Sequence, residues 1–433
     1  MVSILFFILV TGVAFYTAFK NFKNIYDHIQ LGKDEAPRTH AALRWKNVVL
    51  IAFGQKKMFA NPVPAILHLF IYVAFLFTQL ELLEILVDGL FHTHRIFSHA
   101  LGGFYTFLIS LIEFLSVGAF IATIAFLWRR NVLKLKRFRS AEMTSWPRTD
   151  ANLILCLEII LILAIMTMNG SEQVLLQRHQ DVNQHPFLIS RWLGPLFFHS
   201  KTDASLLFLS NAGWWIHYLV VLAFLNYLPF SKHLHVVLAF FHTYYAKLSP
   251  RGEMENIPVI THEVKSMLGL ETTNVSHQTE VPEFGVKDIF DLPKRILLSA
   301  YSCTECGRCT SECPANITGK KLSPRKIMMD IRDRCEEIGH QIKSGKQPLK
   351  EYNDGKSLFD YITSEEIHAC TTCQACVEAC PVLINPMEVI LELRRNEILS
   401  QSKGPANWTA MFNSLENNNC VWPMSESRMS WTH

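Results

Sequence analysis

Eight of the eleven cysteines fall in two short runs with the same spacing. The runs are Cys303-Thr-Glu-Cys306-Gly-Arg-Cys309-Thr-Ser-Glu-Cys313-Pro and Cys370-Thr-Thr-Cys373-Gln-Ala-Cys376-Val-Glu-Ala-Cys380-Pro. In such a run three thiolates bind one corner of an iron–sulfur cubane, while the fourth cysteine, before a proline, ligates the other cluster. The repeat therefore predicts two [4Fe–4S] clusters that exchange their fourth ligands.

The predicted ligand sets follow from this exchange. Cys303, Cys306, Cys309 and Cys380 are expected on the first cluster, and Cys370, Cys373, Cys376 and Cys313 on the second. Two zinc sites are the alternative, since sulfur also suits zinc, but a doubled four-cysteine run ending in proline is far more specific than a lone pair. The remaining cysteines have no motif: Cys156 is expected to be a small core residue, and Cys335 and Cys420 ordinary thiols.

Three histidines in or beside apolar stretches form the second group that could do chemistry. His68, His217 and His235 need a partner or a metal there, because an unpaired polar group in a bilayer is costly. Histidines on facing helices are natural axial ligands of a b-type haem. On one continuous helix His217 and His235 would share a face about 27 Å apart. The alternative is simple hydrogen bonding, and His233 and His242 are interpreted as interfacial residues.

Buried carboxylates are a further candidate group. Glu81, Glu84 and Glu113 lie in apolar surroundings, where a carboxylate could carry quinone protons or could be paired. The sequence assigns them no role.

Long apolar stretches must position the histidines. The chain has 433 residues and is 49% hydrophobic, and the apolar residues concentrate before residue 246. Crossing a bilayer takes about 20 apolar residues in a helix. Stretches of that kind predict spans at 2–19, 63–90, 100–128, 151–168 and 205–229. A soluble helical domain is the alternative, but the second and third stretches are too long and continuous for it.

Basic residues predict how these spans are oriented. Lys and Arg gather in 20–61 and 129–148, whereas 91–99 and 169–204 hold few. Positively charged loops stay in the cytoplasm, so we expect the N-terminus outside and the cysteine motifs inside. The first stretch lacks the basic start and cleavage site of a signal peptide and is expected to remain as a span.

The chain therefore divides into four predicted parts. Residues 1–245 form a transmembrane cytochrome b-like domain, 246–290 a linker with one short helix near 263–270, and 291–400 the two-cluster domain with helices at 324–343 and 386–399. The tail 401–433 carries Trp408, Trp422 and Trp431. The predicted fold class is mainly α: a five-helix transmembrane bundle followed by a cytoplasmic α-helical two-cluster ferredoxin domain.

The run from His217 through Pro229 to His235 resembles the last helix of the respiratory nitrate reductase gamma subunit, in which both histidines ligate haem. That family also has two histidines ten residues apart on the second helix. His68 matches the first, but Thr78 stands at the second. The resemblance implies a haem b between His68 and His235 and leaves His217 and a second haem open. His92, His94 or His99 could replace the missing partner.

The segments 284–293 and 314–324, on either side of the first motif, resemble membrane-bound iron–sulfur oxidoreductases that link electron-transferring flavoprotein to menaquinone, and also heterodisulfide reductase subunits. The resemblance implies menaquinone as substrate. Those proteins often continue into cysteine-rich CCG modules, whereas only Cys420 follows here. A CCG-domain iron–sulfur subunit, electron-transferring flavoprotein, or both are therefore expected partners, with the tail as a docking strip or a disordered terminus.

Together these features predict a quinone-linked oxidoreductase subunit, multi-pass in the bacterial inner membrane. It would pass electrons between a cytoplasmic partner, the clusters, haem b and menaquinone. No flavin or nucleotide loop is visible, so substrate chemistry is expected on a partner chain and catalytic residues are not assigned; nucleic acid is not an expected partner. One alternative is a membrane anchor that feeds a disulfide-reducing partner without quinone chemistry. Another is an anchor whose clusters are structural or sense oxygen.

Overall fold

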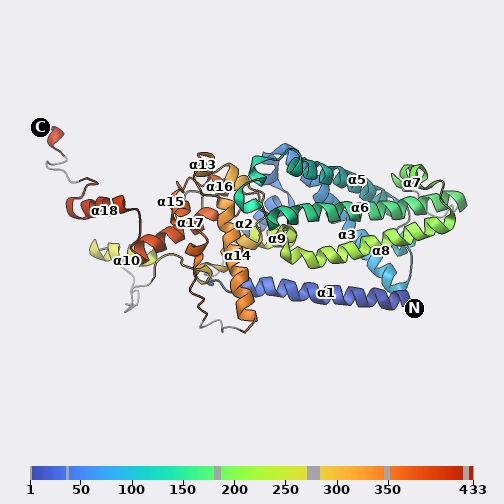
Figure 1. Ribbon diagram of the computed structural model, residues 1–433, viewed down its shortest axis with the longest axis horizontal. Coiled ribbons are helices and arrows are strands. Elements are labelled where there is room, and N and C mark those ends of the chain that lie inside the picture. Colours follow the sequence, from blue (N-terminus) through green and yellow to red (C-terminus); the bar gives the residue numbers. More distant parts are fainter. Residues whose placement is uncertain are drawn as a thin grey trace.

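A computed structural model describes residues 2–35, 39–179, 187–270, 283–345, 352–422 and 429–432. Over these ranges the chain is helical, without a sheet, and one isolated bridge joins Lys33 to Pro293. Long helices form a bundle at one end, and shorter helices form a second body at the other (Figure 1). The predicted mainly α fold is confirmed.

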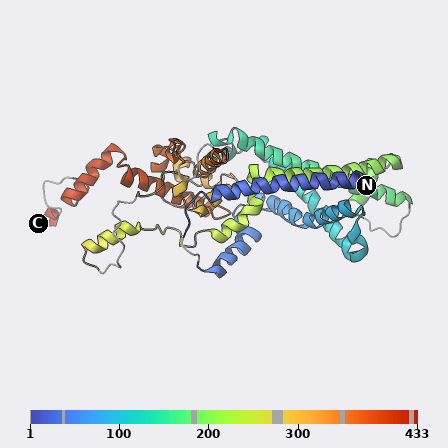
Figure 2. The same cartoon turned by 90° about the horizontal axis from the view of Figure 1, so that it is seen from below.

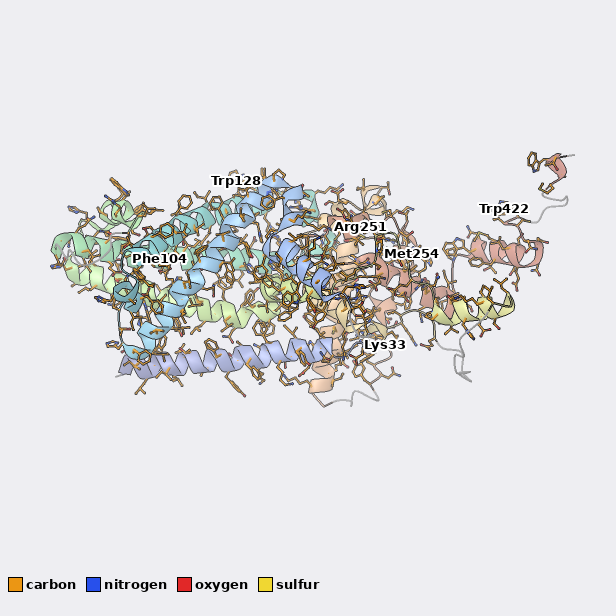
Figure 3. The ribbon with its side chains drawn as sticks, turned by 180° about the vertical axis from the view of Figure 1, so that it is seen from behind. Lys33, Phe104, Trp128, Arg251, Met254 and Trp422 are labelled. Carbon is orange, nitrogen blue, oxygen red and sulfur yellow. The ribbon has the colours of Figure 1, made fainter. Side chains whose placement is uncertain are left out.

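Five helices of the bundle are long and apolar enough to cross a membrane. Phe104 and Trp128, on the third of them, remain more than half exposed (Figure 3), as expected for side chains that face lipid. The five are α1 (Val2–Ile29), α3 (Pro62–Phe91), α5 (Gly103–Asn131), α6 (Trp146–His179) and α8 (Asp203–Tyr227).

Two of these helices extend beyond their predicted ends. Helix α1 was expected to end at residue 19 but continues to Ile29, and its last turns leave the bundle. There Ile25 joins the core of the second body. Helix α6 likewise exceeds the predicted 151–168 at both ends. Cys156 on α6 is exposed, so its prediction as a core residue was wrong: a lipid-facing surface is as apolar as a core.

The prediction that His217 and His235 share one helix was also wrong. Helix α8 ends at Tyr227, two short 3₁₀ turns follow, and His235 begins a separate helix, α9 (His235–Tyr245). Pro229 explains the break, because it lacks an N–H group and its ring clashes with the preceding turn. Ser231 then has extended backbone and caps the second turn by accepting a hydrogen bond from His233 N.

Short segments connect the spanning helices. Next to the second body lie α2 (Ala41–Asn47), a π-helical segment (Val48–Phe53) and the 3₁₀ turn η2 (Lys56–Ala60), which leads into α3. At the opposite end, which we call the distal end, lie α4 (Ile96–Leu101) and α7 (Ser190–Phe198).

The second body is built around α14 (Pro324–Lys343), whose predicted bounds are confirmed. Pro324 stands at the first position and the Ser323 side chain caps the helix, both typical of a helix start. Ile327, Ile331 and Ile338 on α14 are fully buried. The surrounding helices are α11 (Lys294–Tyr301), α12 (Arg308–Ser311), α13 (Pro314–Ile317), α15 (Ser364–His368), α16 (Ala375–Ala379) and α17 (Pro386–Arg395).

Two outer helices extend away from the bundle (Figure 2). Helix α10 (Pro258–Met267) is the predicted linker helix, shifted toward its proline start. Helix α18 (Ala406–Asn418) lies in the tail, where Trp408 packs edge-on against His368 and Trp422 is exposed. The parts of the predicted linker and tail at 271–282, 423–428 and 433 lie outside the described residues.

A buried arginine stabilises the second body. Arg334 on α14 is 1% exposed, and its Nη1 and Nη2 atoms each lie 2.6 Å from a carboxylate oxygen, of Asp354 and Asp288 respectively. Arg334→Met is expected to destabilise this body by about 3–5 kcal/mol, because two carboxylates lose their buried partner. The loss of stability is measured by urea unfolding of the full chain, with limited proteolysis of residues 283–400 as the readout. Lys321→Met, which breaks an exposed pair with Glu365, is the matched control; an equal effect of both variants would contradict the account.

Candidate metal centres

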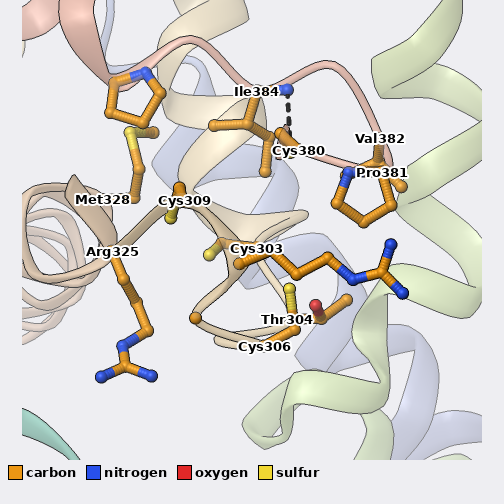
Figure 4. A pocket seen from close by; sticks show the side chains of 13 residues that line it. Cys303, Thr304, Cys306, Cys309, Arg325, Met328, Cys380, Pro381, Val382 and Ile384 are labelled. Atoms are coloured by element: carbon orange, nitrogen blue, oxygen red, sulfur yellow. Dashed lines mark hydrogen bonds between the residues drawn. The ribbon is translucent and has the colours of Figure 1, made fainter. Parts of the chain in front are cut away.

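The first group of cysteines surrounds one hollow in the second body. Cys303 and Cys306 lie on the loop after α11 and Cys309 lies in α12, while Cys380 enters from the loop before α17 (Figure 4). The first loop can turn back on itself because Glu305 and Gly307 have positive φ. A Cβ at Gly307 would lie 2.5 Å from Nη1 of Arg325, so a larger residue there would force this side chain to shift.

The second group surrounds a separate hollow. Cys370 and Cys373 lie on the loop leading into α16, Cys376 lies in α16 itself, and Cys313 reaches them from the end of the first motif. Thr372 and Gln374 have positive φ and bend this loop. The structure therefore groups the eight cysteines as the exchanged ligand sets require, three from one run and one from the other in each hollow.

Most thiols of the two hollows are buried or partly shielded from solvent, and Cys373 is the exposed one of the eight. Burial raises the pKa of Cys303 and Cys376 to about 12 and that of Cys380 to about 11. Without a metal these would be neutral thiols, and iron would supply the positive charge that holds them as thiolates.

Cationic side chains surround the first hollow. Arg325, 1% exposed, lines it and pairs with Glu142 at 2.7 Å. Arg308, between the second and third cysteines, is buried and donates from Nη1 to the carbonyl oxygens of Lys57 and Met58 at 3.3 and 3.5 Å. These charges favour the anionic thiolates and attach the cysteine loop to the bundle.

Three histidines converge where the bundle meets this loop. His68 lies in the second turn of α3, and His235 starts α9 with its ring stacked on His233 at 5.8 Å. Burial, then the neighbouring His235 and His68, lower the pKa of His233 to about 3. His235 Nδ1 lies 2.8 Å from the Lys232 carbonyl, so Nε2 is left available, as in most metal-bound histidines.

His233 and His242 differ from their prediction as interfacial residues. His233 Nδ1 is buried and has no hydrogen-bond partner among the described residues. His242 is 1% exposed and contacts Ser299 of α11. Both are covered because the second body packs on the end of the bundle. The sequence signal for His233 was its position two residues before His235.

His217 lies apart from this group. It is 4% exposed in the middle of α8, and its Nδ1 lies 3.3 Å from the carbonyl oxygen of Leu161 on α6. His92, His94 and His99 are exposed at the distal end, with His94 beside Glu172. This contact agrees with the alternative that His217 only forms a hydrogen bond within the bundle. A second haem at His217 stays a prediction.

An ion-pair group joins the cysteine loop to the histidine segment. Glu305, 4% exposed, accepts from Lys232 Nζ at 2.7 Å and from Arg332 Nη1 at 2.9 Å. Lys232 directly precedes His233 and also lies 3.6 Å from Asp150. The loop that carries Cys303 and Cys306 is therefore fixed beside the histidines.

Lys232→Met is expected to loosen this attachment by about 1.5–3 kcal/mol, since hydrogen bonds between buried charged groups are lost. Amide hydrogen exchange at residues 303–309 would become about tenfold faster or more. Lys247→Met removes an ion pair with the exposed Glu255 and serves as control. Unchanged exchange at 303–309 in Lys232→Met would show that the pair does not position the loop.

Comparison with known proteins agrees with this architecture. The family model described as a 4Fe-4S dicluster domain matches residues 302–384. A probable iron-sulfur-binding oxidoreductase FadF of Bacillus subtilis is 28% identical over 99% of this chain and 60% of its own length. EtfAB:quinone oxidoreductase of Syntrophomonas wolfei is 25% identical over 88% of this chain and 53% of its own.

A shorter relative matches only part of the chain. It belongs to the ferredoxin/F420H2-dependent CoB-CoM heterodisulfide reductase of Methanosarcina acetivorans, and is 34% identical over 25% of this chain and 53% of its own length. No solved structure is matched. The chain thus spans a little over half the length of the long relatives it matches. It is related to iron–sulfur electron-transfer oxidoreductases and carries a 4Fe-4S dicluster domain behind five apolar helices.

Proposed function

We propose that this chain is the membrane subunit of a quinone-linked oxidoreductase. It passes electrons between a cytoplasmic redox partner, two [4Fe–4S] clusters, a haem b and menaquinone. Cys303, Cys306, Cys309 and Cys380 hold one cluster, Cys370, Cys373, Cys376 and Cys313 the other, and His68 and His235 the haem. Bound there, these groups would supply one-electron carriers.

The observation that carries the proposal is the contact between the first cysteine loop and the histidine segments. Arg308 of the loop donates to the turn that leads into α3, the helix of His68. Glu305 of the same loop binds Lys232, three residues before His235. One loop thus contacts both segments that would ligate the haem, and a short route for electrons from cluster to haem results.

The location of the basic loops supports a cytoplasmic position for the second body. The carbonyl of Arg137, in the second basic loop, accepts from Arg325, and Lys57, in the first, lies 3.8 Å from Glu378. Both basic loops therefore face the cysteine-bearing end of the bundle. With positive loops inside, the N-terminus lies outside in a bacterial inner membrane.

The protein's own residues position the carriers and keep water away. The loop turns at Glu305 and Gly307 aim three thiols at one hollow, and Arg325 and Arg308 hold the surrounding backbone. The second hollow, where Cys373 is exposed, would serve the soluble partner. The expected partners are electron-transferring flavoprotein and a CCG-domain iron–sulfur subunit.

A turnover experiment tests the function. Reduced electron-transferring flavoprotein is mixed anaerobically with the purified chain and a menaquinone analogue, and flavin oxidation is followed. We expect electron transfer that depends on both the chain and the quinone analogue. A chain that carries its clusters but transfers no electrons to the analogue would contradict the proposal.

A second candidate function is favoured by the heterodisulfide reductase relative and by the exposed apolar residues of α18, Phe412 and Leu415. Here the chain would anchor and feed a disulfide-reducing CCG-type partner without its own quinone chemistry. Supplying a heterodisulfide and the partner protein in the same assay discriminates the two. Oxidation of the clusters by disulfide and partner, but not by quinone, would favour the second function.

A further inference from the structure

A polar network fills the distal end of the bundle, far from the cysteines. Glu84 accepts from the Tyr105 hydroxyl at 2.7 Å and from Phe97 N at 3.0 Å. Glu113 accepts from the Ser190 hydroxyl at 2.5 Å. Both carboxylates, which the sequence left without a role, are therefore paired within the network.

Arg95 is the cation at the centre of this network. Its guanidinium donates to Glu172 at 2.9 Å and to Asn169 at 2.8 Å, while its backbone N–H donates to Asp88 at 2.7 Å. The φ of Arg95 is positive, so the backbone adopts a rare conformation to bring the side chain inward. Their hydrogen bonds account for the burial of Glu84, Glu113 and Asp88 as structural groups.

Glu81 differs from these paired carboxylates. It is 4% exposed on α3, one turn before Glu84, and its Oε1 has no hydrogen-bond partner among the described residues. It lies on the same helix as Glu84, three residues nearer to His68, and therefore at the inner edge of the network. A buried carboxyl without a partner is costly in a membrane, and such residues commonly mark proton pathways.

Glu81 also lies at a suitable depth for quinone chemistry. It follows His68 by 13 residues on α3, about 20 Å along the axis. Ile85, one turn farther, packs in one cluster with Tyr218, the neighbour of His217. The carboxyl therefore lies at the depth of the second predicted haem ligand.

Titratable groups connect Glu81 with the distal surface. Glu172 lies within the network and its Oε1 is 3.4 Å from Nε2 of His94, whose side chain is 68% exposed. A histidine changes its charge near neutral pH and can therefore exchange protons with water. His94 and Glu172 are therefore a titratable pair between the network and the distal surface.

We propose that Glu81 is the proton-exchanging group for menaquinone, supplied from the distal surface through His94 and Glu172. This inference rests on the proposed function. On reduction the quinone takes up two electrons, delivered singly from the soluble donor by way of the clusters. With each electron the Glu81 carboxyl gives one proton to a quinone carbonyl oxygen, so two O–H bonds form, and the carboxylate is reprotonated through Glu172. Quinol oxidation is the reverse.

Redox-difference infrared spectroscopy of the full chain with a menaquinone analogue tests the inference. A carboxyl C=O band that shifts in D₂O should accompany quinone reduction in the wild type and vanish in Glu81→Gln. Quinone reduction should slow on the order of a hundredfold, as for loss of a positioned acid or base, while iron content stays unchanged. Glu84→Gln, one turn away with the same change of charge, should keep both band and rate.

Separate outcomes distinguish this inference from the proposed function. A wild type that transfers electrons to the analogue without an exchangeable carboxyl band would overturn the inference alone, as would a Glu81→Gln variant with normal band and rate. Should Glu81→Gln not fold, Glu81→Asp retains a carboxyl at altered reach and should show a shifted band. A wild type inactive with quinone would overturn the proposed function.

Discussion

Replacing Cys380 with alanine is expected to remove the first cluster and lower cluster iron, counted besides the haem, from about eight to about four atoms per chain. Cys380 belongs to the second motif but lines the same hollow as Cys303, Cys306 and Cys309. Loss of one thiolate from a four-thiolate site exposes an iron to water, and the cluster should be lost on aerobic purification. Iron and sulfide analysis, with electron paramagnetic resonance of the reduced protein, measures the effect.

Double variants test the exchange of ligands directly. Cys380→Ala combined with Cys309→Ala should lose no more iron than Cys380→Ala alone, because both thiols line one hollow. Cys380→Ala combined with Cys376→Ala should lose nearly all iron, because Cys376 lines the other hollow. Cys420→Ala is the control and should keep all iron. If the Cys380 and Cys309 double variant lost nearly all cluster iron, and the Cys380 and Cys376 double variant lost only half, each motif would hold its own cluster.

The second large effect is expected at the histidines. His68→Ala and His235→Ala should each abolish haem binding, because each variant removes one of the two side chains proposed to hold the haem. The pyridine haemochrome assay, with iron–sulfur content measured in the same sample, determines the result. Cluster content should remain, since the cysteine hollows are formed by the second body alone.

His233→Ala is the matched control for this prediction. Its ring stacks on His235 and is buried in the same group, yet the proposed ligand is His235, whose Nδ1 bonds to the Lys232 carbonyl. His233→Ala should therefore retain haem with a modest change of its spectrum. Loss of haem in His233→Ala, with retention in His235→Ala, would transfer the ligand role to His233.

The cysteine-rich domain could be predicted closely because its signals are local. Pro324 after Ser323 defines a helix start, and α14 has the predicted bounds. The two runs of cysteine spacing predicted which thiols gather, since the ligand geometry of a cubane constrains the loops around it.

The sequence predicted the number of membrane helices, but it predicted their ends and their exposed faces less well. The run from His217 to His235 is apolar enough to predict one continuous helix. Helix α8 nevertheless ends before Pro229, a helix-breaking residue that was visible in the sequence. The face on which Cys156 lies could not be predicted, because lipid and core select the same apolar residues.

The remaining differences arise from contacts between distant segments. His233 and His242 are buried only because α11 and the cysteine loop pack against the end of the bundle. Likewise, the pairing of Glu84 and Glu113 depends on where α4 and α7 fold back. Such contacts have no local pattern in the sequence.

The measurement that tests the account most directly is an optical spectrum of the anaerobically purified membrane protein. The protein is reduced with dithionite and then reoxidised with a menaquinone analogue, with haem and iron quantified. The account predicts a b-type alpha band that bleaches on addition of the quinone, and about eight iron atoms per chain besides the haem. Absence of a haem signal would contradict the assignment of His68 and His235, and would favour a cluster-bearing membrane anchor.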